Sequence, residues 1–106
     1  MKTYTGSRTE HGCVVTVTDD DGCRGLDPRY DLRRHGDGFE WGYGGSGPAQ
    51  LALALAADVL GDDEMAEAVY QRLKFKVVAK LPPTEWAVTA DELARAIWSL
   101  GVIPAE

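Results

Sequence analysis

The chain has 106 residues, a formal net charge of −6 at pH 7, and a hydrophobic fraction of 44%. This length predicts a single domain over residues 1–106 with a modest core, and the negative charge argues against nonspecific nucleic-acid binding, which needs a basic surface. No apolar run reaches the length of a membrane span and residues 1–10 do not resemble a signal peptide, so we expect a cytoplasmic protein of a bacterium or an infected host cell.

The N-terminal third predicts an antiparallel sheet. Residues Tyr4–Arg8 and Gly12–Thr18 are rich in β-branched side chains with partial alternation, which is typical of strands. The acidic turn cluster 19–22 ends in Asp-Gly and favours a tight hairpin, with residues 24–26 returning as a third strand. A calcium loop would need further ligands and a distal glutamate that the sequence lacks, so we interpret the acidic triplet as a solvated turn.

The two cysteines predict neither a disulfide nor a metal site. Cys13 lies well before the turn and Cys23 beside it, so they would not face each other in a regular hairpin. Neither belongs to a Cys-x-x-Cys pair. We therefore expect free thiols and no metal ligands.

The next segment leads toward a glycine-rich loop. Asp27 followed by Pro28 is typical of a helix cap and first helical position, and predicts a short helix or turn that ends near Gly36. Aromatic side chains then alternate at Phe39, Trp41 and Tyr43, which predicts a short strand with all three on one face. Such a face is most often core, but an aromatic wall beside an anion site would also suit stacking of a nucleobase.

Residues 48–60 predict a buried central helix. The only polar side chains in this stretch are Gln50 and Asp58, so the helix has no polar face to expose. Pro48 suits the first turn and Gly61 suits the left-handed residue that ends a helix. Because a small domain would struggle to cover this surface, we also expect a homo-oligomer.

Two more helices and a strand complete the predicted fold. Residues 62–81 begin with acidic and end with basic side chains, which complements the helix dipole, and Pro82 ends the pattern. Residues 86–88 predict a short strand, and 89–92 form a capping box for a last helix with the apolar face Leu93, Ala94, Ile97 and Trp98. The fold class is therefore α+β: a small antiparallel β-sheet packed on two or three α-helices.

The loop before the central helix reads Gly42-Tyr43-Gly44-Gly45-Ser46-Gly47. A glycine-rich turn at a helix N-terminus offers unpaired N–H groups and the positive end of the helix dipole, which favour an anion. The alternative is that the glycines let the helix pack closely against aromatic neighbours. A dinucleotide fingerprint is excluded because a second helical pattern follows instead of a strand, and a nucleophile elbow fails because Pro48 replaces its last glycine.

Arg29 is the side chain best suited to join such a site, because arginine makes forked contacts with carboxylates and phosphates. It could equally pair with a neighbouring aspartate. No triad or metal-ligand spacing indicates a catalytic residue, and no cofactor is predicted. The candidate ligand-binding residues are Arg29, Trp41, Tyr43, Gly44, Gly45, Ser46, Gly47 and Gln50.

Several landmarks resemble an uncharacterised family of short proteins from bacteria, archaea and phages, carried as a domain of unknown function. The matching residues include His35 and the continuous run 38–55, GFEWGYGGSGPAQLALAL, and extend over most of the chain; the others are Leu26–Arg29, Asp31-Leu32, Leu60–Asp62, Tyr70-Gln71, Lys74 and Trp86. The resemblance does not indicate a particular catalytic reaction, because the family has none assigned to it. The presence of the family in phages and mobile elements implies a role in host–virus conflict.

Three functions compete at this stage. The first is noncatalytic binding of a small anionic ligand, such as a nucleotide immune signal, by a sequestering counter-defence protein of a phage or mobile element. The second is a protein–protein inhibitor or adaptor with a purely structural glycine loop. The third is an enzyme that hydrolyses a phosphoester.

Overall fold

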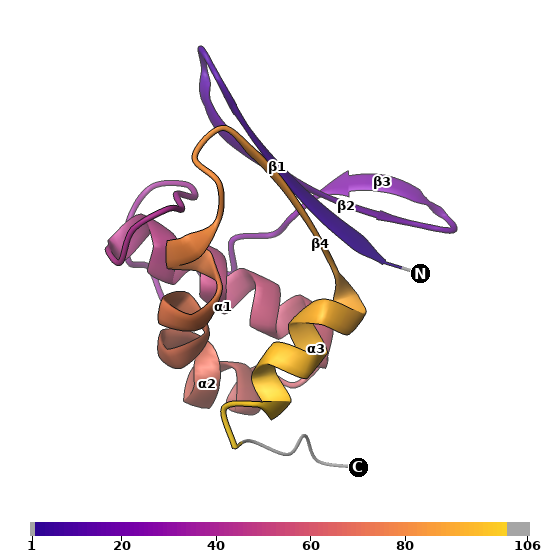
Figure 1. Cartoon of the computed structure of the whole chain (residues 1–106), viewed down its shortest axis with the longest axis vertical. Coiled ribbons are helices and arrows are strands. Elements are labelled where there is room, and N and C mark those ends of the chain that lie inside the picture. Colours follow the sequence, from indigo (N-terminus) through magenta and orange to yellow (C-terminus); the bar gives the residue numbers. More distant parts are fainter. Residues whose placement is uncertain (1, 102–106) are drawn as a thin grey trace.

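The computed structural model describes residues 2–101 (Figure 1). A four-stranded antiparallel sheet has the order β3-β2-β1-β4. Its strands are β1 (Thr3–Thr9), β2 (Gly12–Asp19), β3 (Gly22–Gly25) and β4 (Glu85–Thr89). The helices gather on one side of the sheet in Figure 1, so the α+β class is confirmed.

The sheet turns its apolar side chains toward the helices. In β1, Tyr4 and Gly6 are buried, and Gly6 lies opposite Val15 of β2 and Trp86 of β4. The alternate residues form the outer face, where the hydroxyl oxygens of Thr5 and Thr16 are 2.7 Å apart. This alternation is the period of a half-buried strand.

The predicted central helix is α1, Ser46–Leu60. Every residue from Pro48 to Ala57 is buried, and α1 packs against both α2 (Asp63–Lys76) and α3 (Ala90–Trp98). Gly61 ends α1 with φ 64° and donates its N–H to the carbonyl of Ala57, as the sequence predicted. The shortage of polar positions that suggested self-association is thus accounted for within a single chain, and the homo-oligomer stays a prediction.

The second helix is shorter than predicted. Asp62 caps α2 by accepting a hydrogen bond from the N–H of Met65, but regular helix ends at Lys76. Val77 has φ −120° and ψ −61°, and a 3-10 turn, η1 (Val78–Lys80), follows. The carbonyl of Val78 accepts the N–H of Leu81 at 3.3 Å within this turn and also the N–H of Gly42 at 3.0 Å.

The predicted strand across Phe39, Trp41 and Tyr43 is wrong. Trp41 is 1% exposed and Tyr43 is 52% exposed, so the two rings do not share a face. The cause is Gly42, whose φ of 87° turns the chain between them. Upstream, the predicted helix or turn is a single turn in which Leu32 N–H bonds the carbonyl of Arg29.

The C-terminal elements agree with the sequence except for one side chain. Thr89 and Glu92 form both hydrogen bonds of the capping box of α3. Leu93 and Ile97 are buried, whereas Trp98 is largely exposed and does not belong to the buried face. Both cysteines are free, and no helix among residues 2–101 is long and apolar enough to cross a membrane.

Candidate functional site

Two glycines of the loop lie directly beneath aromatic rings. A Cβ on Gly44 would lie 2.9 Å from Cε1 of Phe75, and one on Gly45 would lie 2.6 Å from Cε2 of Tyr43. Only a residue without a side chain allows this approach. The rings nevertheless remain open to solvent, at 52% for Tyr43 and 61% for Phe75. We call Tyr43, Gly44, Gly45 and Phe75 the aromatic–glycine surface.

The start of α1 borders this surface and carries uncompensated positive charge. Gly45 is the N-cap, and no side chain caps the helix or contributes an acidic group to its first turn. The N–H groups of Ser46 and Gly47 belong to the first turn, where helical backbone offers no acceptor. The positive end of the dipole therefore has no negative counterpart on α1 itself.

Lys74, whose side chain is mostly buried, lies beside the Phe75 ring of this surface. Lys74 is only 9% exposed, and its ammonium nitrogen is 4.4 Å from the ring centroid of Phe75. Within residues 2–101 it has no hydrogen bond and no carboxylate at ion-pair distance. Buried lysines are rare unless they are paired, so this ammonium is a second uncompensated positive group at the surface.

Neither Lys74 nor Phe75 was among the candidate site residues from sequence. From the sequence, Lys74 belongs to the basic end of its helix, which complements the helix dipole, and to the residues that match the uncharacterised family. The available signal was its spacing: Lys74 comes four residues after Tyr70 and directly after Leu73, inside the buried stripe of α2. A charged residue at a stripe position is a reason to suspect a special environment.

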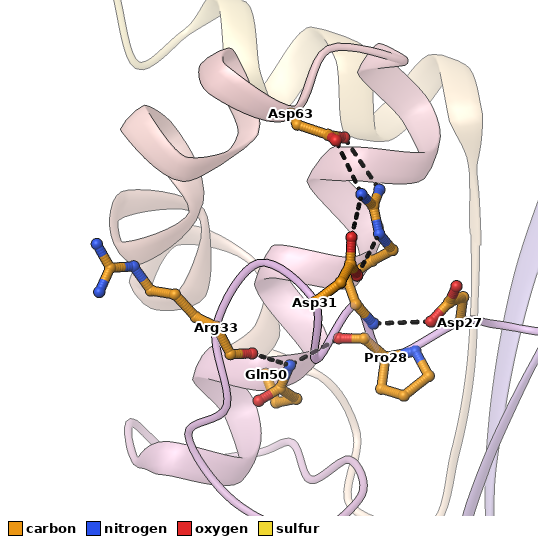
Figure 2. Close-up of polar contacts among 7 residues, drawn as sticks. Asp27, Pro28, Asp31, Arg33, Gln50 and Asp63 are labelled. Carbon is orange, nitrogen blue, oxygen red and sulfur yellow. Dashed lines mark hydrogen bonds and ion pairs between the residues drawn. The ribbon is translucent and has the colours of Figure 1, made fainter.

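Arg29 does not join the glycine loop. Its guanidinium donates to both oxygens of Asp31 at 3.0 Å and to both oxygens of Asp63 at 3.0 and 2.8 Å. The hydrogen bonds to Asp31 raise the pKa of Arg29 above its ordinary value, and those to Asp63 add a smaller contribution in the same direction. Asp63, labelled in Figure 2, opens α2 close to Gly61. The guanidinium therefore lies at the opposite end of α1 from Gly44.

Gln50 is a structural clamp. It is fully buried, accepts the N–H of His35 at 2.7 Å, and donates to the carbonyls of Pro28 at 2.6 Å and Arg33 at 3.0 Å. Figure 2 shows its amide between the last two residues. Its hydrogen-bonding groups therefore hold the 28–35 loop against α1 and are not directed to a ligand.

Trp41 belongs to the core. Its indole N–H donates to the carbonyl of Pro83 at 3.1 Å, and its ring packs edge-on with Trp86 at a centroid distance of 5.5 Å. Arg8 lies over the ring at 5.1 Å from its centroid. Of the three alternating aromatics, Tyr43 alone is open enough to stack on a ligand.

The carboxylate of Glu40, which packs against Gly47 of the loop, is paired with a cation. A Cβ on Gly47 would lie 2.6 Å from Cβ of Glu40, but the carboxylate of Glu40 accepts bonds from Arg8 at 2.8 and 3.1 Å. The hydrogen bond from Arg8 holds the pKa of Glu40 below its ordinary value. Glu40 thus stays ionised without leaving an unpaired negative charge beside α1.

The described part of the chain contains no group of three or more His, Cys, Asp or Glu side chains that could hold a metal ion. Comparison with family models found one match over residues 4–99, to a family of unknown function (DUF6166). Searches of curated proteins and of solved structures found no match.

Proposed function

The chain belongs to that family of unknown function, and we propose that it is a noncatalytic binding protein for a small anionic ligand with a planar ring, such as a nucleotide. The ligand would occupy the aromatic–glycine surface next to the start of α1. The observation that carries the proposal is Lys74, a largely buried side chain whose ammonium has no acidic partner within residues 2–101 and lies against a largely exposed ring.

The positive groups of this region would receive the anion. The first turn of α1 offers N–H groups and a dipole end that no acidic side chain offsets, and such helix starts bind phosphate readily. Lys74 adds a positively charged ammonium group 4.4 Å from the ring centroid of Phe75. The surface is therefore locally positive although the chain as a whole is negative.

The aromatic rings would receive the planar part of the ligand. Tyr43 and Phe75 each lie close to glycine backbone and remain largely exposed, so a base could stack on them. Stacking of a base on an aromatic ring contributes about 1–3 kcal/mol. A protein that binds a nucleotide without converting it lowers its free concentration, and we propose sequestration of a nucleotide signal as the biological role.

The test is a titration with three probes: adenosine monophosphate, adenosine and inorganic phosphate. Isothermal titration calorimetry should show the tightest binding for the nucleotide, because only it engages both the ring and the charge. Lys74→Met keeps the apolar stem and removes the charge, and should weaken nucleotide binding about tenfold. Arg95→Ala, which removes an exposed charge on α3, is the matched control and should bind normally.

Either of two results would overturn the proposal. If adenosine monophosphate and inorganic phosphate neither release heat nor change the melting temperature, the lysine is not a ligand-binding group. Equal affinity of the wild type and Lys74→Met for the nucleotide would have the same meaning.

A second candidate is the protein–protein inhibitor or adaptor. It is favoured by the exposure of Tyr43 and Phe75, because rigid exposed aromatics are common anchors of protein interfaces. It predicts that Phe75→Ser abolishes capture of a partner from lysate while inorganic phosphate has no effect on that capture. Competition by phosphate would favour the anionic ligand instead.

A further inference from the structure

A cleft of about 610 Å³ opens beside the C-terminal half of α1, away from the aromatic–glycine surface. Its volume falls in the range of small-molecule sites, about 300–1,000 Å³. The floor consists of three buried apolar side chains, Leu26, Ala54 and Ala57. Charged side chains from β3 and from the 27–31 loop form the walls.

One wall is positive. Arg24 donates through Nη2 to Asp58 at 2.8 Å, and Lys2 contacts the same carboxylate at 3.2 Å. Two cations therefore share one anion. The remaining donors of the Arg24 guanidinium, on Nε and Nη1, have no partner within residues 2–101, and the side chain is 49% exposed.

The facing wall is negative. Arg29 is shared between Asp31 and Asp63, so here two anions share one cation. Asp27 adds a further carboxylate: its Oδ1 accepts the N–H of Arg29 at 2.9 Å, and its Oδ2 has no partner in the described part of the chain. The carboxylate excess is thus on the side of Asp27 and Asp31.

The negative wall is also fixed in position. Arg29 has a φ of 60°, a left-handed conformation that is unfavourable for a residue with a side chain. The bond from its N–H to Asp27 and the bond from Gln50 to the Pro28 carbonyl hold this conformation (Figure 2). A fixed wall has less freedom to lose when a ligand binds.

From this arrangement we infer that the cleft binds a small zwitterion of the α-amino acid type with an apolar side chain. A free N–H donor of Arg24 would bind its carboxylate in a charge-assisted hydrogen bond. Asp27 and Asp31 would accept hydrogen bonds from its ammonium group, and the side chain would lie on the floor at Leu26 and Ala54. This inference does not depend on the function proposed above.

The test uses leucine and two analogues that each lack one charge. N-acetyl-leucine has no ammonium group and leucine amide has no carboxylate. Amide chemical shifts around Ala57 and Asp27, followed by NMR on the ¹⁵N-labelled protein, should saturate with leucine below about 10 mM. Each analogue should bind about tenfold more weakly, the loss typical of one charged hydrogen bond.

Two variants locate the binding to the cleft. Asp27→Asn keeps an oxygen for the N–H of Arg29 and removes the charge, so it should fold normally and bind leucine about tenfold more weakly. Arg24→Gln should weaken leucine but not leucine amide; its melting curve reports whether loss of the Asp58 contact unfolds it, in which case Asp27→Asn alone decides. Lys74→Met should bind leucine like the wild type, which separates this cleft from the aromatic–glycine surface.

Any of three outcomes would overturn the inference. The first is an absence of saturable shifts with leucine. The second is N-acetyl-leucine binding as tightly as leucine, which would make the cleft an anion site, and the third is leucine amide doing so, which would make it a cation site.

Discussion

The side-chain amide of Gln50 donates to the carbonyl oxygen of Pro28 over 2.6 Å, from the middle of a helix whose other buried side chains are all apolar. The same side chain bonds the N–H of His35 and the carbonyl of Arg33. One glutamine thus supplies partners for three backbone groups of a loop that forms no regular structure of its own. The loop can pack on α1 because these groups are satisfied.

Replacement of Gln50 by Leu should therefore be strongly destabilising even though leucine is apolar and of similar size. Three backbone groups would lose their partner, and an unsatisfied buried group costs about 1–3 kcal/mol. Because water can reach part of the loop, we expect a total loss of about 3 kcal/mol. Urea unfolding measures it, with the exposed Gln71→Leu as control. A loss below about 1 kcal/mol would mean that the loop does not need the clamp.

Replacement by alanine should destabilise the protein strongly at Gly6 and hardly at all at Gly25. A Cβ on Gly6 would lie 2.3–2.5 Å from three ring atoms of the buried Trp86, whereas a Cβ on Gly25 meets nothing within 4 Å. Gly6→Ala should lose about 3 kcal/mol, the upper part of the usual range for overpacking, and Gly25→Ala should change stability by less than about 0.5 kcal/mol.

A double variant with Trp86 tests the cause of the loss predicted for Gly6→Ala. If the clash with Trp86 is the cause, the double variant Gly6→Ala, Trp86→Leu should lose clearly less stability than the sum of the two single variants. Simple addition of the two losses would show that Gly6→Ala acts in another way.

The core position of α1 has its own test. Leu55 is fully buried, and Leu55→Ala should reduce the free energy of unfolding by about 2–5 kcal/mol through lost transfer energy and a new cavity. Val14→Ala, on the exposed face of β2, is the control and should lose much less. A change of only a few tenths of a kcal/mol at Leu55 would contradict the packing of α1 described above.

Local patterns were enough to predict most of the fold. The alternation of Tyr4–Arg8 and Gly12–Thr18, the apolar run 48–60 and the capping box at Thr89 each depend on residues close in sequence, and each element is present. The predicted strand at 39–43 failed because Gly42 adopts a φ of 87°. That conformation is tied to a hydrogen bond with Val78, which is distant in sequence.

The site was less accessible to sequence reasoning for the same reason. Proximity along the chain suggested that Arg29 would face the glycine loop. Its guanidinium instead donates hydrogen bonds to Asp63, near the other end of α1. The approach of Phe75 to Gly44 joins segments about thirty residues apart. Such pairings depend on how α2 packs on α1, which no local pattern records.

Asp58 should make stability depend on pH in the acid range. Burial alone would raise its pKa, but hydrogen bonds from Tyr4 at 2.6 Å, Arg24 and Lys2 outweigh burial and hold the pKa below its ordinary value. A carboxylate whose pKa is lowered by folding stabilises the protein above the ordinary value, near pH 4, and this contribution is lost as the pH falls through the folded value.

Asp58→Asn preserves the shape of the side chain and removes the charge. At pH 7 it should lower the free energy of unfolding by about 2 kcal/mol, because hydrogen bonds to a charged group contribute about 1.5–3 kcal/mol. The difference from the wild type should shrink below pH 4, where the wild-type carboxylate also becomes protonated.

Asp31, Glu40 and Glu92 also have lowered pKa values, so both proteins should lose stability in acid. Urea unfolding of both proteins between pH 2 and 7 separates the two effects, and a difference that stays constant below pH 4 would show that Asp58 acts through its shape and not its charge.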